Sequence, residues 1–323
     1  MRSLTEIART MIAPRAQGLL TFLSVLPLIL GLGASLSSGQ QQGQQTFASP
    51  GEAVEALTAA AKAGNTDALM QIFGPEGKEV LSSGDEVADK NNRDQYIQRY
   101  DQMHRLVTEP DGTVTLYIGA DNWPLPIPLV KKDNVWYFDT VAGKQEILYR
   151  RIGRNELATI DVCGALVAAQ KQYASEPHDG EPAGQYAKKL ASDPGKHNGL
   201  FWKAAAGEPQ SPIGPLIADA VSAGYSKKQG GPTPFHGYIY KHLDSQGKDA
   251  PGGAKDYIVD GKKTGGFATV AYPAEYRNSG VMTFIVNQDG IVYQKDLGPE
   301  TARIAAAMTQ FDPDNTWQEV PED

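Results

Sequence analysis

The chain has 323 residues, of which 41% are hydrophobic, a composition typical of folded globular proteins that excludes a disordered one. Its 38 Asp and Glu residues exceed its 30 Lys and Arg residues, which gives a net charge of −8. Nucleic acids and anionic lipid surfaces select clustered Lys and Arg, so this balance disfavours both as partners. Cys163 is the one cysteine, which excludes an internal disulfide.

The beginning of the chain has the pattern of a secretory signal peptide. A cationic start is followed by an apolar run over residues 19–36 and by small residues at 37–39. This order predicts that residues 1–39 are a cleaved leader and that the mature protein is periplasmic or secreted. An uncleaved membrane anchor is the alternative, because the run is nearly long enough to span a bilayer. Cleavage is favoured by Pro27, and contact with the membrane is then limited to the leader before cleavage.

Residues 40–47 are rich in Gln and Gly and are interpreted as a polar linker. Folded structure is predicted to begin directly after it. Ser49, Pro50 and Glu52 have the order of an N-cap, a first-turn proline and a capping-box glutamate. The helix that they start is expected to stop at Gly64. Helical spacing then predicts a second short helix that ends at residues 74–75 and a third over residues 96–107.

From residue 113 the hydrophobic period changes to two, which predicts strands. Val114, Leu116 and Ile118 alternate with other residues, and two further strands are expected at 126–131 and 135–139. Helices followed by antiparallel strands form an α+β domain, which we place at residues 48–142. In its order of elements this domain resembles the cystatin-like cone that is also found in nuclear-transport-factor-like proteins.

Residues 143–323 are predicted to form a second α+β domain. Helical spacing covers 143–174, where 153–155 is a candidate break or restart, and a short helix is expected at 215–223. The later elements are expected to be strands at 235–243, 255–259, 265–271, 282–286 and 291–295, and a helix at 301–309. Asp289-Gly290 is typical of a hairpin turn.

Several segments along the mature sequence carry a specific resemblance. They are Phe47–Pro50, Gly74–Gly77, Trp123–Val130, Arg151–Leu157, Ala205–Pro209, Pro273–Tyr276, Gly280–Asn287 and Tyr293–Gly298. Through them almost the whole mature chain resembles a bacterial family of exported proteins known as domain of unknown function 2950. The resemblance implies export, and it implies no activity.

The C-terminal half has a second resemblance. A helix that contains Ala168–Ala174 is followed by Gly214–Ile217, by Gly237–Tyr240 and by a hairpin at Thr283–Gly290. This order is similar to the globular part of type IV pilin-like proteins, and it implies a long helix with an antiparallel meander. In pilins that helix continues a hydrophobic N-terminal segment with an acidic residue near its start. Here a whole domain precedes the helix, so we expect no filaments.

The sequence predicts no catalytic residue, no metal site and no cofactor. Ser245–Lys248 and Lys263–Gly265 match the S-x-x-K and K-T-G motifs of penicillin-binding enzymes. Both lie in one loop-rich stretch and are interpreted as solvated turns. The histidines lack the local spacing of a zinc site, and His178–Glu181 has too few alternating acidic residues for a calcium loop. Pairs of carboxylates that folding brings together stay open.

Aromatic side chains give the one candidate binding site. Trp123 lies among prolines, and Trp136 and Phe138 follow on the next predicted strand. If the first domain is a cone, these residues and Tyr100 and Met103 line an apolar pocket on its concave face. Most of them are expected to lie in the core, with one or two exposed to a ligand.

The sequence therefore predicts an exported, non-enzymatic, envelope-associated protein with an accessory or protein-interaction role. Its expected partner is an envelope protein or a cell-wall component. The first alternative is a binding protein for a small apolar or sugar-like ligand in the pocket of the N-terminal domain. The second alternative is a hydrolase whose catalytic groups meet only in the folded chain.

Overall fold

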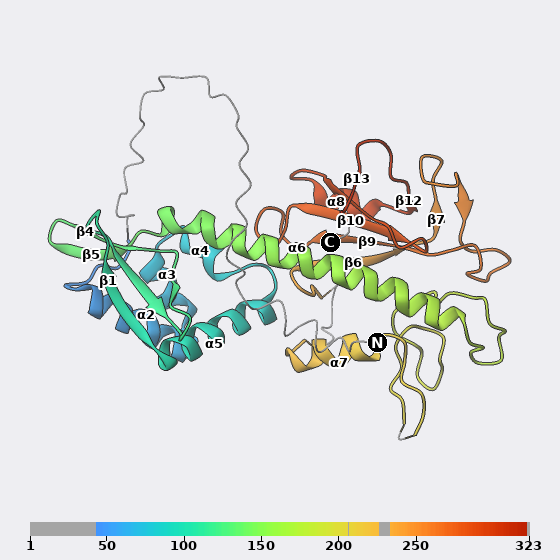
Figure 1. The fold of residues 1–323 in the computed structure, drawn as a ribbon, viewed down its shortest axis with the longest axis horizontal. Coiled ribbons are helices and arrows are strands. Elements are labelled where there is room, and N and C mark those ends of the chain that lie inside the picture. The colour runs from blue at the N-terminus through green and yellow to red at the C-terminus, as the bar shows by residue number, and fades with distance from the viewer. Residues whose placement is uncertain (1–42, 206, 226–232, 322–323) are drawn as a thin grey trace. The chain divides into compact units, whose positions relative to one another are not determined.

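The computed structural model describes residues 43–205, 207–225 and 233–321 (Figure 1). The predicted signal peptide at 1–39 lies outside the described residues. Residues 44–47, which were expected in a polar linker, belong to the folded part of the chain. The Gln44 Nε2 atom is buried and donates to the carbonyl oxygens of Ile72 (3.0 Å) and Phe138 (2.8 Å). Buried Phe47 exchanges two backbone hydrogen bonds of 2.8 Å with Trp136.

The N-terminal half begins with helices α2 (Pro50–Ala63), α3 (Thr66–Phe73), α4 (Gly77–Leu81) and α5 (Glu86–Gln102). The predicted start of α2 is confirmed, since the Ser49 Oγ accepts the N–H of Glu52 (3.2 Å). Its end is confirmed too, because Gly64 adopts a left-handed φ of 61° and donates its N–H back to the last turn. The second predicted helix corresponds to α3.

The third predicted helix, over residues 96–107, is wrong in its second half. Helix α5 ends at Gln102, and residues His104–Thr108 form strand β1. Strand β1 pairs antiparallel with β2 (Val114–Ile118) in a register that runs from His104 opposite Ile118 to Thr108 opposite Val114. Pairing with a strand beyond the intervening turn therefore outweighs the local helical spacing.

The first sheet has the strand order β1-β2-β4-β5, and β3 also pairs with β2. Its remaining strands are β3 (Trp123–Pro124), β4 (Leu129–Lys132) and β5 (Val135–Phe138). The alternation predicted for β2 is confirmed, because Val114, Leu116 and Ile118 are buried and their neighbours are less so. These residues pack with the apolar faces of α2 and α3 in one hydrophobic core.

Helix α6 (Thr140–Ala174) is continuous over 35 residues, so the break considered at 153–155 is wrong. At 1.5 Å per residue its axis is about 52 Å long. The domain boundary proposed at residue 142 lies within its first turn, and the described residues all belong to one compact unit. Among the described residues, no helix is both long enough and apolar enough to cross a membrane.

The C-terminal half contains a sheet of order β13-β11-β10-β9-β6. Its strands are β6 (Tyr238–Leu243), β9 (Ala268–Pro273), β10 (Met282–Asn287), β11 (Val292–Asp296) and β13 (Gln318–Glu319). A smaller sheet joins β7 (Ser245–Gln246), β8 (Lys255–Asp256) and β12 (Gln310–Phe311). The described chain is therefore α+β, with strands near most of the predicted positions.

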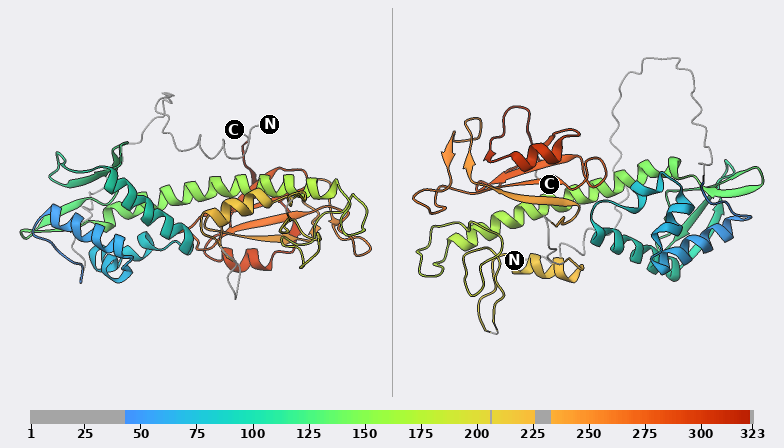
Figure 2. Two further views of the ribbon diagram at one scale, coloured as in Figure 1. Left: turned by 90° about the horizontal axis from the view of Figure 1, so that it is seen from below. Right: turned by 180° about the vertical axis from the view of Figure 1, so that it is seen from behind.

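Helices cover both faces of this larger sheet (Figure 2). On one face Phe284 packs in a cluster with Cys163 and Val167 of α6. On the other face Ile285 packs in a cluster with Ala305 of α8 (Thr301–Ala307). Because neighbouring residues of β10 point to opposite faces, burial on both sides explains its nearly continuous apolar sequence. Helix α7 (Gly214–Ser222) confirms the short helix predicted there.

Three polar residues of α6 bind the loop between β9 and β10. The Asn155 Nδ2 donates to the Ser279 carbonyl oxygen (2.8 Å), and the Glu156 Oε1 accepts two backbone N–H groups at the start of β10 (2.9 and 3.0 Å). Arg151 is 5% exposed and donates to the Asn278 Oδ1 of the same loop. These bonds hold the middle of α6 against the C-terminal sheet.

Arg151 also reaches the N-terminal half. Its guanidinium donates to the carbonyl oxygens of Glu79 (2.7 Å) and Val80 (2.6 Å) in α4. Asn278 completes the connection, since its Nδ2 donates to the Ser82 carbonyl oxygen (2.8 Å). One buried cation therefore binds α4, α6 and the β9–β10 loop together.

Asp85 is a second buried connection, at 2% exposure. Its Oδ1 caps α5 by accepting the N–H groups of Val87 (3.2 Å) and Ala88 (3.1 Å). Its Oδ2 accepts the Tyr225 hydroxyl (2.7 Å) and the Gly237 N–H (3.0 Å). The residue that starts α5 thus also ties this helix to the C-terminal half.

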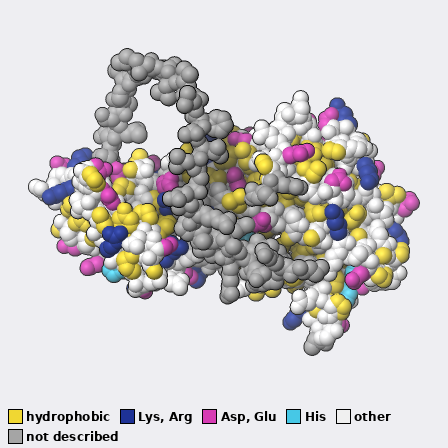
Figure 3. All heavy atoms as spheres, in the orientation of Figure 1, with side chains coloured by type: hydrophobic (Ala, Val, Ile, Leu, Met, Phe, Trp, Pro, Cys, Tyr) yellow, Lys and Arg dark blue, Asp and Glu magenta, His cyan; other side chains and the backbone are white. Residues whose placement is uncertain are grey.

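Charges of both signs are interspersed over the described residues on the face shown in Figure 3. Exposed ion pairs occur among the described residues, such as Lys62 with Asp101 (2.7 Å) and Lys90 with Asp94 (2.5 Å). On this face the basic residues do not gather in one patch.

A buried histidine and lysine lie in the C-terminal half. Lys263, which was expected in a solvated turn, is 0% exposed, and its Nζ lies 3.1 Å from the Asp244 Oδ1. The nearby His242 of β6 has a buried Nδ1 without a hydrogen-bond partner in the described part of the chain. Burial, together with the charge of Lys263, lowers the pKa of His242 to about 4.

Replacing Arg151 with Met is expected to lower the free energy of unfolding by about 3 kcal/mol, because it leaves buried carbonyl oxygens without their charged donor. Arg303→Met is the matched control. Arg303 of α8 is exposed and forms an ion pair with Glu300, the residue before α8, so a change within about 0.5 kcal/mol is expected. Urea unfolding measures both values, and equal stabilities of the two variants would contradict the role given to Arg151.

His242 gives a pH-dependent contribution to stability. Its pKa is lower in the folded chain than in the unfolded one, so below pH 6.5 the unfolded state takes up the proton more readily. Stability is therefore expected to fall between about pH 6.5 and pH 4, by on the order of 2–3 kcal/mol. Unfolding of wild type and His242→Gln across this range measures the effect. Identical pH slopes in the two proteins would refute it.

Candidate ligand-binding cleft

Two adjoining cavities lie in the N-terminal half. We name them by residues that line only one of them: the Trp123 cavity, of about 300 Å³, and the Leu57 cavity, of about 180 Å³. The residues that line both are Val80, Asn92, Tyr96, Leu125 and Arg151. The two cavities are therefore adjacent, and we call them together the cleft; helices α4, α5 and α6 and the loop after β3 line both, and α2 and α3 also line the Leu57 cavity.

Two helix faces meet across the Trp123 cavity. Each face consists of residues at positions i, i+3, i+4 and i+7, which lie on one side of an α-helix. The face of α5 is Asn92, Gln95, Tyr96 and Arg99, and the face of α6 is Ile147, Arg150, Arg151 and Arg154. Because Arg151 and Asp85 fix these helices, the two faces are held at a defined separation.

A tight turn places Trp123 in the cavity. Gly119 has a φ of 76° and donates its N–H to the carbonyl oxygens of Arg99 and Met103 at the end of α5. Asn122, with a φ of 52°, is held through its Oδ1 by the Arg105 Nε (3.0 Å). The turn thus brings the start of β3 back against the end of α5.

The Trp123 ring lies close to guanidinium groups from both helices. The Cζ of Arg99 on α5 is 5.9 Å from the ring centroid, and the Cζ of Arg150 on α6 is 5.3 Å from it. Such distances allow cation–π attraction. Trp123 therefore contributes an aromatic surface and helps to keep both arginines at the cavity.

Arginine dominates the charge of the Trp123 cavity. Its lining residues include four arginines and no Asp or Glu. Arg99 pairs with Asp121 (3.3 Å) and Arg150 with Glu146 (2.6 Å). The side chains of these two arginines and of their two acidic partners are partly or largely exposed. For Arg154 the described residues provide neither an ion pair nor a hydrogen bond. The cavity is therefore basic within an acidic protein.

Burial lowers the pKa of the Arg151 and Arg154 guanidinium groups below their ordinary values. Asp89, Glu275 and Glu79 partly oppose this effect at Arg151. At Arg154 burial is the single cause, and no acidic side chain opposes it. Arg154 is nevertheless exposed at the surface, so water screens part of its charge.

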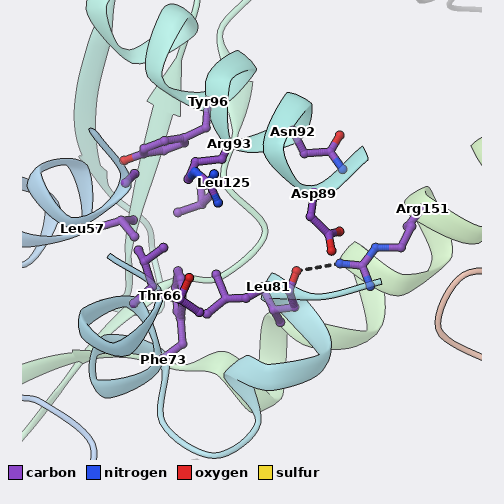
Figure 4. Close-up of a pocket in the computed structure, with 13 residues that line it drawn as sticks. Leu57, Thr66, Phe73, Leu81, Asp89, Asn92, Arg93, Tyr96, Leu125 and Arg151 are labelled. Atoms are coloured by element: carbon purple, nitrogen blue, oxygen red, sulfur yellow. Dashed lines mark hydrogen bonds between the residues drawn. The ribbon is translucent and has the colours of Figure 1, made fainter. Parts of the chain in front are cut away.

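The Leu57 cavity is largely apolar (Figure 4). Leu57, Phe73 and Leu81 come from α2, α3 and α4, and Tyr96 of α5 lies across from them. The Tyr96 hydroxyl is 2.9 Å from the Thr58 Oγ1, and burial raises the pKa of this phenol. This cavity adds apolar surface next to the arginines.

Asp89 is the one acidic residue among those that line the Leu57 cavity. Its carboxylate accepts hydrogen bonds from the Ser83 N–H (3.0 Å) and hydroxyl (2.7 Å). Burial raises its pKa, while Ser83 and Arg151 act in the opposite direction. Asp89 is thus engaged in holding the segment before α5.

Of the five residues expected to bind a ligand, Trp123 lies in the cleft lining and the other four lie elsewhere. Trp136 is half-buried and pairs with Phe47. Phe138 is fully buried in the core, and Tyr100 stacks on His104 with 3.9 Å between ring centroids. Met103 is the C-cap residue that follows α5.

Sequence reasoning missed the arginines and Tyr96. The signal was present in the spacing of residues 150, 151 and 154 and of residues 92, 95, 96 and 99. Helical spacing shows that each group shares a face, but it does not show that the two faces meet. That information comes from the packing of α5 and α6.

The acidic loop considered for calcium is engaged in internal contacts. The Asp179 Oδ2 accepts the His197 N–H (2.8 Å), and the Glu181 Oε2 lies 2.6 Å from the Lys262 Nζ. His178 stacks on Tyr173 with 3.9 Å between ring centroids. In the described ranges, no group of three His, Cys, Asp or Glu side chains is placed to hold a metal ion.

The comparison with known proteins agrees with the resemblance of the whole mature chain. The model of the family described as "Protein of unknown function (DUF2950)" matches residues 44–320. No curated protein and no solved structure matches the chain at a significant level. The family match covers the helices and strands that form the cleft and all three sheets. The chain therefore belongs to the DUF2950 family.

Proposed function

We propose that this protein is an exported, non-enzymatic binding protein of the bacterial envelope, and that its cleft holds a small ligand. The proposal rests on one observation: one face of α5, one face of α6 and Trp123 together line a cavity of about 300 Å³. Ligand sites in proteins are typically concave, largely apolar and supplied with a few convergent polar groups. The cleft has each of these properties.

The chemistry of the lining supports binding rather than hydrolysis. The polar groups of the Trp123 cavity are guanidinium, amide and phenol groups from α5 and α6. These groups donate hydrogen bonds and orient a ligand. A hydrolytic site needs a nucleophile or an activated water beside a general base, and the alternative of a hydrolase therefore has less support in this cleft.

The order and packing of the elements support two finer proposals about the fold. In the N-terminal half, helices pack on an antiparallel sheet, as a cystatin-like domain requires. In the C-terminal half, α6 packs on an antiparallel sheet, as a pilin-like domain requires. Export is proposed from the leader-like sequence at 1–39.

Trp123→Leu is expected to abolish the rise in melting temperature that a bound ligand causes, because it removes the aromatic surface of the cavity. The measurement is thermal unfolding of wild type and variant with a panel of small apolar and sugar-like molecules. The matched control is Trp136→Leu, since Trp136 is half-buried in the same half but does not line the cleft.

The control variant is expected to keep the ligand-induced rise, even if its own melting temperature is lower. Equal loss of the rise in both variants would show that the effect is a general loss of stability. Absence of a rise in the wild type with every member of the panel would remove support for a binding function.

A protein-interaction role is the second candidate, and exposed apolar side chains of α6 support it. Val141, Tyr149 and Leu157 are 53%, 64% and 61% exposed, and each is turned by about 80° around the helix from the one before. We propose that α6 contacts an envelope protein or a cell-wall component around Tyr149, the most exposed of the three.

A photo-crosslinking residue in place of Tyr149 is expected to capture a specific envelope component in living cells. The same residue in place of Arg303, on α8, is the control, because Arg303 is equally accessible but lies on another helix. Adducts that are found at position 149 and not at 303 support the interaction role. The same adducts at both positions, or none, would count against it.

A further inference from the structure

We propose that the cleft selects a small amphipathic anion. In this assignment Arg99, Arg150 and Arg154 bind a phosphate or carboxylate headgroup, and an apolar body lies against Trp123 and extends toward the Leu57 cavity. The inference rests on the proposed binding function and adds the chemical class of the ligand.

The charge of the cavity is the first argument. A protein with a net charge of −8 places four arginines and no acidic residue in the lining of one cavity of about 300 Å³. Clustered like charges repel one another, and partial burial increases the repulsion. An anionic group would relieve it. Arginine is also the residue whose planar fork matches phosphate and carboxylate geometry.

The partners of each arginine decide which of them are free to bind. Arg151 is committed to the carbonyl oxygens of α4 and to Asn278. Arg154 has no partner in the described part of the chain. It therefore offers all of its donors to a ligand.

Arg99 and Arg150 hold their acidic partners only at the surface. The distance from Arg99 to Asp121 is 3.3 Å, and Asp121 is 56% exposed. Glu146, the partner of Arg150, is 50% exposed. Exposed ion pairs of this kind contribute about 0–1 kcal/mol, so an anionic headgroup can replace either carboxylate at little cost.

The apolar surface is the second argument. Trp123, Leu125 and Ile147 line the cavity beside the arginines. Leu125 also lines the Leu57 cavity, where Leu57, Leu69 and Phe73 continue the apolar surface. A ligand with a charged end and an apolar end matches this gradient, whereas a bare inorganic anion would leave the apolar surface in water.

Titration calorimetry on the mature full chain tests the assignment with four probes: octyl phosphate, octanol, octyltrimethylammonium and inorganic phosphate. Octyl phosphate is expected to bind at least tenfold more tightly than each of the others, and its affinity is expected to fall with added salt. Octanol that binds as tightly as octyl phosphate would overturn the anion assignment and leave the binding function in place. Absence of any binding of octyl phosphate would also overturn the anion assignment.

The variant Arg154→Gln tests the contact with the anionic headgroup without disturbing the fold. It is expected to weaken octyl phosphate at least tenfold and to leave the affinity for octanol unchanged, with no loss of melting temperature. Arg303→Gln is the matched control, since it removes an exposed arginine outside the cleft, and it is expected to leave both affinities unchanged. Equal affinity of Arg154→Gln and wild type for octyl phosphate would overturn the assignment.

Failure of the binding function itself has a different signature. In that case Trp123→Leu alters neither the octanol nor the octyl phosphate affinity. A ligand that binds outside the cleft would give this result, whereas failure of the anion assignment alone leaves the Trp123 dependence intact.

The same headgroup chemistry occurs in lipids and in free metabolites, and a vesicle assay distinguishes these sources. Co-sedimentation with phosphatidylglycerol vesicles, lost in Arg154→Gln and absent with phosphatidylcholine, would assign the headgroup to a lipid. Binding of octyl phosphate without co-sedimentation would assign it to a free amphipathic anion. Both results support the anion assignment.

Discussion

The cleft depends on one buried cation. Arg151 reaches the carbonyl oxygens of α4 in one direction and Asn278 in the β9–β10 loop in the other. Since α5 follows α4 directly and its first residues are capped by Asp85, this pair of buried charges determines where α5 lies relative to α6. Helix α5 has no fully buried residue, and its partly buried Tyr96, Ile97 and Tyr100 pack against the N-terminal core. The cavity between the two helices therefore depends on these apolar contacts and on the polar ones together.

The sequence predicted those elements correctly whose formation depends on residues close to one another in the chain. The N-cap at Ser49 and the alternation in β2 predicted the correct elements, because capping and strand burial involve neighbouring residues. The helix predicted through residue 107 was wrong, because β1 forms by pairing with β2 beyond a turn. The break considered at 153–155 was wrong as well, since contacts of Asn155 and its neighbours with a distant loop support the helix there.

The candidate site was predicted only in part, and the reason is physical. Aromatic residues mark both cores and binding sites, so sequence alone could not separate Trp123, which lines the cavity, from Phe138, which lies in the core. The arginines of α6 shared a visible spacing, yet their role depends on a second helix that faces them. Three contacts outside the local sequence, at Asp85, Asn278 and the turn at Gly119, bring these residues together.

The continuity of α6 has a consequence for how the chain folds. The first turns of this helix pack in the core of the N-terminal half through Ile147, and its later turns pack on the C-terminal sheet through Cys163 and Val167. A cut at residue 142 would take from the first half the helix that closes its core. It would leave the second half with an uncovered apolar stretch of α6. We therefore expect that neither half folds alone and that the two unfold as one cooperative unit.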